Sequence, residues 1–350
     1  MKNDSFASAL LIWFDVTKRT LPFRETRNPY FIWVSEIMAQ QTRISALLPY
    51  FEKFIARFPT VEALAAAQES EVLTLWAGLG YYSRARNLHK AAQLLCREHG
   101  GQLPRSLTAL RALPGVGDYT AGAIASIAFG LQTPAVDGNV LRVFARLTAY
   151  RGDIRATEAK SAATAWVQSH MTKQNAGALT EALMELGALV CIPGGPEGQS
   201  PRCDICPVSN YCQARGQGLT GQLPLLSAKT PPRPVRRTVL LLRNAEGAYA
   251  LRQRTERLLK GMWEFPSDED ADAAGLLYTR GAHVLDVRHV FTHLIWEMEG
   301  LHGTLLSDAL PEGWCLAQPE TLPELALPSA MRAFAAYVSA ESAGDAPPRR

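Results

Sequence analysis

The stretch Leu113–Asn139, LPGVGDYTAGAIASIAFGLQTPAVDGN, decides the fold expected for the first part of the chain. Its Pro-Gly-Val-Gly turn contains Gly115 and Gly117, which lack a Cβ and so permit positive φ and the close approach of another backbone. The turn leaves unpaired amide donors at the start of the small-residue helix that follows, a suitable position for a phosphate. The stretch ends beside Asp137, where a second helix begins. We therefore expect a helical hairpin that grips a DNA backbone close to a carboxylate.

Asp137 has two roles open to it. The apolar residues that follow it recur at helical spacing and predict a helix: Val140, Val143, Phe144 and Leu147. An aspartate at the start of a helix caps it by accepting hydrogen bonds from the first amides. Capping alone is enough to explain Asp137. The roles are compatible, because we expect a capping aspartate to be held rigid while one of its oxygens stays free for chemistry.

The composition indicates a soluble globular protein with two domains. Of the 350 residues, 47% are hydrophobic and 20% are charged, and the length favours two cores over one. The N-terminus has no signal-peptide pattern, and no apolar run approaches the roughly 20 residues that span a bilayer. We expect a cytoplasmic monomer without a membrane segment. Residues 1–225 carry 22 Lys and Arg against 17 Asp and Glu, and the remainder 14 against 16, which fits an anionic partner for the first part only.

The apolar pattern predicts an all-helical domain over residues 1–214, built from short segments with apolar residues at i, i+3 and i+4. The predicted helices are Phe6–Val16, Pro29–Gln41, Ile44–Phe58, Val61–Ala67, Glu71–Leu79, Arg84–His99, Leu107–Leu113, Ala121–Phe129, Val140–Leu147, Ala156–Ser169 and Ala176–Leu189.

Residues 215–236 gather Pro, Gly and Arg without periodicity and predict a linker. The remaining pattern predicts a second, α+β domain over residues 237–338. Its predicted elements are strands at Thr238–Arg243, Tyr249–Arg254 and Val284–Glu299, the last broken near Thr292, and one helix at Pro328–Val338. We expect residues 339–350 to form a disordered tail.

Four cysteines follow one another closely in the sequence. Cys203, Cys206 and Cys212 form a C-x2-C-x5-C triplet, and Cys191 precedes it at the end of a predicted helix. Four thiolates in one short loop suit an iron–sulfur cluster or a structural Zn²⁺, and unligated cysteines are the alternative. The spacing by itself favours neither metal.

The run from Glu181 to Cys191, EALMELGALVC, together with the cysteine triplet resembles the iron–sulfur end of the endonuclease III superfamily. That superfamily carries a [4Fe–4S] cluster behind a helix-hairpin-helix, and LPGVGDYTAGAI matches the hairpin. The resemblance therefore implies that Cys191, Cys203, Cys206 and Cys212 hold a [4Fe–4S] cluster. The sequence departs from the family in one respect, because Ile192–Arg202 places eleven residues between the first two cysteines where six are usual.

Glu36 is the one acid in a predicted helix that is apolar on most sides, WVSEIMAQQT from Trp33 to Thr42. Burial disfavours the charged form of a carboxyl, so we expect its pKa to rise to where the group donates a proton at neutral pH. The segment alone equally permits a glutamate on the solvated side of its helix. With the hairpin and Asp137, an acidic Glu36 points to cleavage of a glycosidic bond in DNA, which needs an acid for the leaving base, a negative group beside the sugar cation and an extruded nucleotide.

Five runs, in matching order, resemble the MutY family of A/G-specific adenine DNA glycosylases: LPFR (Leu21–Arg24), SEIMAQQT (Ser35–Thr42), GLGYYSRARNLH (Gly78–His89), LPGVGDYTAGA and VDGNV (Val136–Val140). The resemblance implies that Glu36 protonates adenine at N7 and that Asp137 stabilises or transiently traps the sugar cation. It further implies that Tyr119 and Asn139 line this site, that Arg24 and Glu181 hold the extruded adenine, and that Gln41 and Tyr81 fill the duplex where the base has left. Core packing is the alternative for Tyr81 or for its neighbour Tyr82.

Tyr119 predicts the type of reaction. Lyase members of the superfamily have a lysine at this position that forms a Schiff base with the sugar, and a phenol cannot do this. We therefore expect a monofunctional glycosylase that leaves an abasic site. Phe23 stands where the MutY family usually has Trp, and Ala39 where it usually has Leu. Both changes put a smaller apolar side chain in the wall of the base pocket, so adenine should stack less tightly against it.

The segment Arg254–Pro266, RTERLLKGMWEFP, resembles the start of a Nudix fold. The metal-binding helix of active Nudix hydrolases is missing, so we expect no pyrophosphatase activity, and we expect the acids Asp268–Asp270 to lie in a solvated loop. The MutY resemblance instead implies that this domain recognises 8-oxoguanine through Arg288–His293, with Phe291 intercalating and Thr292 and His293 donating hydrogen bonds. Thr292 replaces the usual Ser.

The sequence thus predicts a mainly α protein: a helix-hairpin-helix glycosylase domain with an iron–sulfur loop, followed by an α+β Nudix-like domain. The expected substrate is double-stranded DNA that contains adenine opposite 8-oxoguanine or guanine. Two alternatives stay open at this point, a thymine-glycol-type glycosylase and lyase, and a non-catalytic iron–sulfur protein that binds DNA lesions. Tyr119 and the second domain argue against the first alternative. The joint presence of Glu36 and Asp137 argues against the second.

Overall fold

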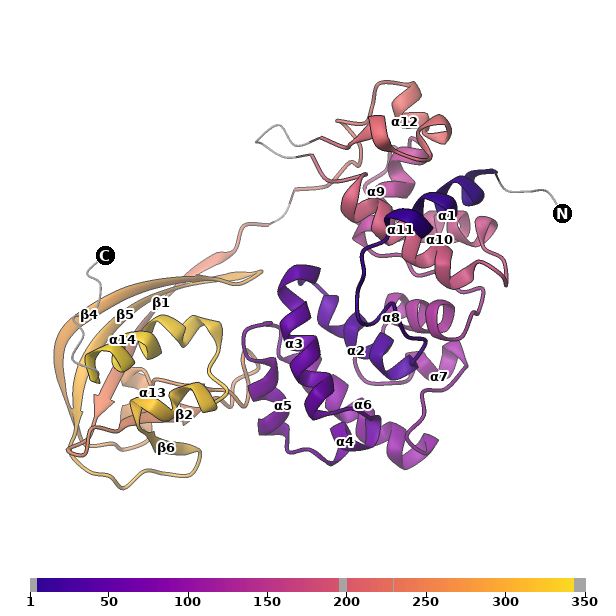
Figure 1. The fold of residues 1–350 in the computed structure, drawn as a ribbon. Coiled ribbons are helices and arrows are strands. Elements are labelled where there is room, and N and C mark those ends of the chain that lie inside the picture. The colour runs from indigo at the N-terminus through magenta and orange to yellow at the C-terminus, as the bar shows by residue number, and fades with distance from the viewer. Residues whose placement is uncertain (1–4, 195–199, 229, 343–350) are drawn as a thin grey trace. The chain divides into compact units, whose positions relative to one another are not determined.

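The computed structural model describes residues 5–194, 200–228 and 230–342 (Figure 1). Its internal contacts divide the chain into two units, Met1–Ala66 with Asn87–Ala228, and Ala67–Arg86 with Lys229–Arg350. The first unit is helical and the second contains a β-sheet. The expected domain limit at residue 214 falls before this division, because residues beyond it are tied back to the helical unit. The amide of Ile154, for example, donates to the carbonyl of Leu225 at 3.1 Å.

Most helices agree with the expected segments to within a few residues at their ends, and α12 was not expected. They are α1 (Ser5–Thr17), α2 (Pro29–Ala39), α3 (Ile44–Arg57), α4 (Val61–Ala66), α5 (Glu69–Trp76), α6 (Ser83–His99), α7 (Leu107–Arg111), α8 (Asp118–Ala123), α9 (Gly138–Leu147), α10 (Thr157–His170), α11 (Ala176–Leu189) and α12 (Gln213–Gly216). The expected helix Ala121–Phe129 is instead the end of α8 followed by a π-helical turn, Ile124–Ala128.

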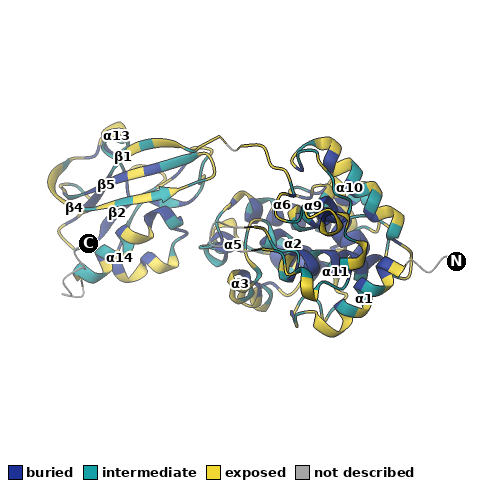
Figure 2. Ribbon diagram, turned by 90° about the horizontal axis from the view of Figure 1, so that it is seen from above, coloured by how far each residue is buried: buried dark blue, intermediate teal, exposed yellow. Residues whose placement is uncertain are grey.

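Helix α11 lies in the interior of the helical unit, where most of its ribbon is buried (Figure 2). It shares one hydrophobic core with α1, α9 and α10. Small residues let its neighbours approach closely: a Cβ on Gly187 would lie 2.6 Å from the Cβ of Asn139 at the start of α9. The absence of that Cβ brings α9 and α11 together at the residue expected to line the active site.

The second unit confirms the α+β fold. Its strands are β1 (Arg233–Arg243), β2 (Tyr249–Gln253), β3 (Trp263–Glu264), β4 (Tyr278–Val290), β5 (Leu294–Leu305) and β6 (Trp314–Ala317). They form one sheet in the order β3-β2-β1-β5-β4, with β6 paired to β2. The pair β1–β5 is parallel and the other pairs are antiparallel. Helix α14 (Arg332–Ser342) packs on one hydrophobic cluster of the sheet, and α13 (Asp268–Ala273) lies beside the other.

Two expectations for this unit are wrong. Residues 339–342 belong to α14 and are not disordered, because Val338 is buried in the core and holds the end of the helix. The rest of the expected tail, residues 343–350, lies outside the described residues. The acids Asp268–Asp270 begin α13 and do not form a solvated loop: Ser267 and Asp270 form a capping box, and Asp268 pairs with Arg280 at 2.7 Å.

A buried ion network connects three strands of the second unit. Glu264 on β3 is fully buried, and Arg254 Nη1 donates to both of its oxygens at 2.7 and 2.6 Å. Arg252 lies 2.7 Å from the same carboxylate, and Arg237 lies 3.6 Å away. Removing one partner of such a network leaves the other charges buried without compensation, which lowers the free energy of unfolding.

We predict that Glu264→Gln destabilises the second unit by about 3–5 kcal/mol, the range observed when one member of a buried ion pair is removed. Urea unfolding followed by tryptophan fluorescence would measure the loss, because Trp263, Trp296 and Trp314 all lie in this unit. Glu256→Gln is the matched control. Glu256 pairs with Arg252 at 2.6 Å but its side chain is 45% exposed, so its loss should cost no more than about 1 kcal/mol. Equal losses in both variants would contradict the prediction.

Candidate active site

The helical unit contains a cavity of about 920 Å³ that brings together residues from distant parts of the sequence. Eight of the predicted site residues line it: Arg24, Glu36, Gln41, Gly117, Tyr119, Asp137, Asn139 and Glu181. They come from the segment before α2, from α2 and its end, and from α8, the start of α9 and α11. The structure therefore assembles one site from residues that the sequence separates by as many as 157 positions.

Glu36 lies on α2 with its carboxylate enclosed by the other cavity residues. The Tyr119 hydroxyl donates a hydrogen bond to Oε2 at 2.6 Å. Burial raises the pKa of the Glu36 carboxyl to about 7. The hydrogen bond from Tyr119 opposes this rise, and the nearby carboxylates of Asp137 and Glu181 add to it. The alternative of a solvated glutamate is wrong, because the apolar faces of α2 are covered by the rest of the unit.

Tyr119 stays protonated at neutral pH. Burial and the adjacent carboxylates of Glu36 and Asp137 raise the pKa of this phenol well above its ordinary value. The hydroxyl is therefore a fixed hydrogen-bond donor for Glu36. The position offers no amine that could attack a sugar.

Asp137 caps α9, as expected. Its Oδ1 accepts from the amide of Val140 at 2.7 Å. The expectation that the other oxygen is free is wrong, because Oδ2 accepts from Asn139 Nδ2 at 2.8 Å. Burial raises the pKa of Asp137, while the hydrogen bonds from Val140 and Asn139 lower it. The carboxylate is thus held in one orientation at the wall of the cavity.

Arg142 was not foreseen from the sequence, and it connects Asn139 to the cysteine-bearing segment. Its Nη2 donates to Asn139 Oδ1 at 2.7 Å and to the carbonyl of Gly187 at 2.8 Å. Its Nε donates to the carbonyl of Cys191 at 2.7 Å. A chain of hydrogen bonds therefore runs from Asp137 to the main chain of Cys191. The i, i+3 spacing of Asn139 and Arg142 on one helix was the available signal.

Arg24 and Glu181 form an ion pair, with Nε and Oε1 3.4 Å apart. Arg24 also donates from Nη2 to Oε2 of Glu185 at 2.8 Å. Glu185 and its other partner, Arg19, were not predicted as site residues, although both line the cavity. The position of Glu185 one helical turn after Glu181 on an apolar helix could have indicated it.

Gln41 and Tyr81, the residues expected to fill the opened duplex, share an unusual backbone conformation. Their φ angles are 57° and 48°, in the left-handed region that non-glycine residues seldom adopt. Tyr81 is 46% exposed, whereas Tyr82 is 3% exposed and belongs to the core. In the hairpin turn only Gly115 has positive φ (77°), and a Cβ there would meet Asn87 at 2.7 Å. Gly117 is extended and precedes α8.

The second unit places the expected lesion-recognition residues around the end of β4. The hydroxyls of Tyr81 and Thr292 lie 2.8 Å apart. Phe291 packs edge-on against the rings of His289 and Trp296, at centroid distances of 4.6 and 4.8 Å. His293 is exposed, and its carbonyl accepts from the amide of Arg233.

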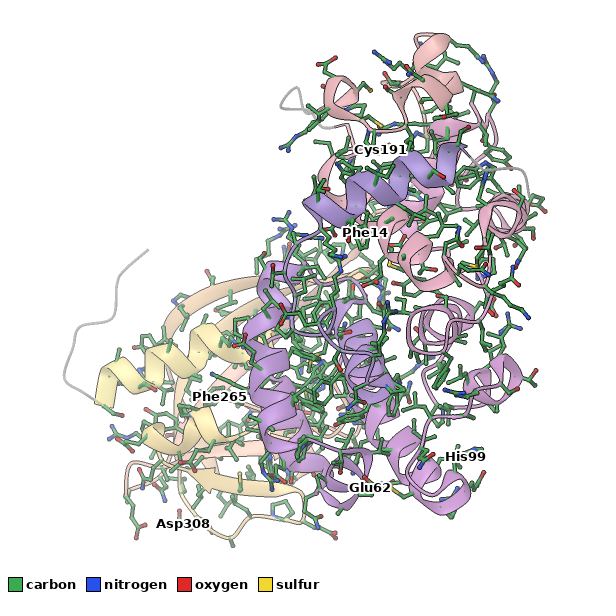
Figure 3. The ribbon with its side chains drawn as sticks, turned by 45° about the vertical axis from the view of Figure 1, so that its right-hand side comes forward. Phe14, Glu62, His99, Cys191, Phe265 and Asp308 are labelled. Atoms are coloured by element: carbon green, nitrogen blue, oxygen red, sulfur yellow. The ribbon has the colours of Figure 1, made fainter. Side chains whose placement is uncertain are left out.

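The four clustered cysteines line one small cavity of the helical unit. Cys191 lies directly after α11 (Figure 3), and its Sγ accepts a hydrogen bond from Arg146 Nη1 at 3.3 Å. Burial raises the pKa of the Cys206 thiol to about 11, and the other three cysteines contribute to the rise. In the described part of the chain, no three His, Cys, Asp or Glu side chains are grouped so as to hold a metal ion.

Comparison with known proteins agrees with these features. Residues 34–169 match the HhH-GPD superfamily of base excision DNA repair proteins, and residues 238–337 match the Nudix domain. A solved structure of a thermostable thymine-DNA glycosylase is 26% identical, with a TM-score of 0.53, and the match covers 61% of this chain and 95% of that one. An endonuclease III–DNA complex has a TM-score of 0.51 at 23% identity, over 61% of this chain and 94% of that chain, and shows the same fold.

Three relatives among known sequences are adenine DNA glycosylases. The protein of Homo sapiens is 34% identical over 85% of this chain and 67% of its own length, and that of Mus musculus is 42% identical over 64% and 44%. The protein of Buchnera aphidicola from Acyrthosiphon pisum is 32% identical over 77% and 76%. The chain spans less than half of the mouse relative.

The helical unit and its cavity define a base excision repair protein of the HhH-GPD superfamily. Within that class, the chain belongs to the adenine DNA glycosylase family. In the described residues no helix is both long and apolar enough to cross a membrane.

We predict that Glu36→Gln stabilises the helical unit in a pH-dependent way. The pKa of Glu36 is raised from 4.5 to about 7 on folding, so between these values the folded state binds more protons than the unfolded state and stability falls as pH rises. The variant escapes this loss, which reaches about 3 kcal/mol above pH 7.

Urea unfolding followed by circular dichroism should therefore show that the advantage of Glu36→Gln is about 2 kcal/mol larger at pH 8 than at pH 5. Glu52→Gln, on the exposed side of α3, controls for the loss of one negative charge from the same unit. An advantage that stays constant over this range would show that Glu36 titrates as an ordinary glutamate.

Proposed function

We propose that this chain hydrolyses the N-glycosidic bond of adenine in double-stranded DNA, where the adenine lies opposite 8-oxoguanine or guanine. The observation that carries the proposal is the pairing of a buried, protonatable Glu36 with a fixed Asp137 in one cavity. The relatives named adenine DNA glycosylases support the choice of base.

Glu36 supplies the proton for the leaving base. With a pKa of about 7, a large share of the molecules carry a protonated Glu36 at neutral pH, and the Tyr119 hydroxyl keeps the carboxyl oriented. Transfer of this proton to N7 of adenine lets the base leave with the electrons of the C1′–N9 bond. The rate of the step should decline as pH rises above about 7.

Asp137 faces the positive charge that develops on the sugar. A carboxylate held by Val140 and Asn139 needs no rearrangement as the oxocarbenium-like state forms. Asp137 either stabilises this cation or traps it transiently at C1′. Water then adds to C1′ and gives up a proton, which leaves an abasic site and free adenine.

Four more of the predicted site residues act on the extruded nucleotide or on the duplex it has left. Arg24 and Glu181 are placed to make hydrogen bonds to the adenine. The exposed side chains of Gln41 and Tyr81, held by strained backbone, fill the space that the base has left. Because position 119 offers a phenol and no amine, the reaction stops at the abasic site.

The second unit recognises the base opposite the adenine. Its Nudix match begins within β1, at residue 238, and covers the rest of the sheet. The metal-binding helix of Nudix hydrolases has no counterpart in the sequence. Phe291, Thr292 and His293 follow β4 and supply an aromatic ring, a hydroxyl and an imidazole for stacking and hydrogen bonding with 8-oxoguanine.

A thymine-glycol-type glycosylase and lyase is disfavoured because no amine stands at position 119. A non-catalytic lesion binder is disfavoured because it would gain nothing from burying Glu36 at a cost in stability.

The reaction should release adenine from a duplex with adenine opposite 8-oxoguanine, and strands should break only after alkali. Glu36→Gln and Asp137→Asn should each slow release at least about 100-fold, or about 2.7 kcal/mol of barrier. Asn at position 137 still caps α9, so its defect is chemical. Glu52→Gln should match the wild type. No adenine release by the wild type, or strand breaks trapped by borohydride without alkali, would overturn the proposal.

We propose further that Cys191, Cys203, Cys206 and Cys212 hold a [4Fe–4S] cluster. Four thiols that line one cavity are a suitable donor set for such a cluster or for Zn²⁺. The resemblance of this segment to the iron–sulfur end of the endonuclease III superfamily favours the cluster. Arg146 beside Cys191 Sγ offsets part of the negative charge of the thiolates. When bound, the cluster would crosslink the ends of a loop of which residues 195–199 lie outside the described residues, and it could exchange an electron.

Purified protein should contain about four iron atoms per chain and absorb visible light as a brown solution. Cys206→Ser should lower both, because it removes one thiolate ligand. Cys96→Ser, on α6, and Cys315→Ser, on β6, should change neither. Zinc in place of iron, or normal iron content in Cys206→Ser, would contradict this assignment.

A further inference from the structure

One more carboxylate in the lining of the base pocket, that of Glu185, takes no part in the chemistry proposed above. Glu185 lies on α11 one turn after Glu181, and its side chain is fully buried. A buried carboxylate costs several kcal/mol unless its charge is paired and its lone pairs accept hydrogen bonds. The partners of Glu185 therefore indicate what it holds in place.

Four hydrogen bonds converge on this carboxylate. Arg19 donates to Oε1 from its main-chain amide at 3.0 Å and from Nε at 2.8 Å, and to Oε2 from Nη2 at 2.6 Å. Arg24 donates to Oε2 from Nη2 at 2.8 Å. Burial by itself raises the pKa of Glu185, but these bonds hold it at about 2. The group is therefore a permanent anion.

The two arginines are the ends of one short segment, Arg19–Arg24, which joins α1 to α2. It contains Leu21, Phe23 and Arg24, all of which line the cavity. Within the segment, Arg24 Nη1 donates to the carbonyl of Arg19 at 3.4 Å. The Glu185 carboxylate on α11 thus accepts hydrogen bonds from Arg19 and Arg24, the two ends of a segment that lines the base pocket.

Arg24 is held between two carboxylates that have different surroundings. Its shorter contact is with Glu185, at 2.8 Å, and its contact with Glu181 is 3.4 Å long. On another side, its guanidinium lies 5.5 Å from the ring centroid of Phe14, labelled on α1 in Figure 3. The contact of Arg24 with Glu181 is therefore the longer of its two ion pairs, and both Arg24 and Glu181 line the cavity.

We infer that Glu185 is a positioning residue for the base pocket: it fixes Arg19–Arg24 against α11, so that Arg24 and Glu181 meet the extruded base in a prearranged geometry. The inference rests on the proposed function, in which these two side chains bind adenine. Without the anion, Arg24 would turn fully onto Glu181, and each would lose the orientation that the base needs.

Glu185→Gln is nearly isosteric and turns one acceptor oxygen into a donor that faces a guanidinium. We expect single-turnover release of adenine at saturating enzyme to slow by about 10- to 100-fold, the penalty of a misplacement near 1 Å. Duplex affinity should change less than about 3-fold, because phosphate contacts dominate it. In a duplex with 2-aminopurine in place of the adenine, the fluorescence change on insertion into the pocket should be reduced. Glu158→Gln, exposed on α10, should behave as the wild type.

A double-mutant cycle tests whether Glu185 acts through Arg24. Arg24→Ala/Glu185→Gln should be no slower than Arg24→Ala alone, since the second change then removes nothing further. Fully additive defects would overturn the inference, as would wild-type release and 2-aminopurine insertion by Glu185→Gln. A proportional loss of duplex binding and of melting temperature would assign Glu185 a purely structural role and equally overturn it.

If Glu185→Gln does not fold, Glu185→Asp keeps the charge and shortens its reach by one methylene. That variant should fold and release adenine more slowly than the wild type, and wild-type release by it would overturn the inference. A wild type that releases no adenine contradicts the proposed function itself. An active wild type with an equally active Glu185→Gln contradicts only the role given to Glu185.

Discussion

The rest of the site depends on the burial of one carboxylate, that of Glu36. Helix α2 carries it into the unit because the helix is apolar on most sides, and α8 brings the Tyr119 hydroxyl to 2.6 Å from it. Removal from water makes the proton hard to lose and places the pKa near 7. A solvated glutamate would be ionised at neutral pH and would have no proton to give.

Glu36, Asp137 and Glu181 are three of the carboxylates that line the cavity, and arginines lie close to them. Arg24 lines the cavity with them and is held by Glu185, whereas Arg142 is not among the lining residues and is held by Asn139 and by the carbonyl of Gly187. The repulsion that remains is useful, because it raises the pKa of Glu36. Stability and activity are opposed at this position, as is common for catalytic acids.

In the second unit, the residues that stabilise the fold differ from those proposed to recognise the lesion. Its stability rests on the sheet, on α14 and on the fully buried Glu264 with three arginines around it. The residues proposed to read the lesion follow the end of β4, outside that network. Nudix-like architecture is retained while the acids at the start of α13 serve as a helix cap and as ion-pair partners. The residues proposed to recognise the lesion therefore lie outside the groups that stabilise the sheet.

The sequence by itself determined the helices, the hairpin, the strand-rich second part and the set of cavity residues from Arg24 to Glu181. These depend on local spacing and on short motifs, which a single chain displays directly. It left open whether Glu36 is solvated, and it assigned Asp137 a free oxygen that Asn139 in fact occupies. It also missed Arg19 and Glu185, which bind each other across 166 positions, and Arg142, which connects Asn139 to the carbonyl of Cys191. Burial and long-range hydrogen bonds are properties of packed elements, so only the tertiary structure decided the protonation of the acid and the anchoring of the base pocket.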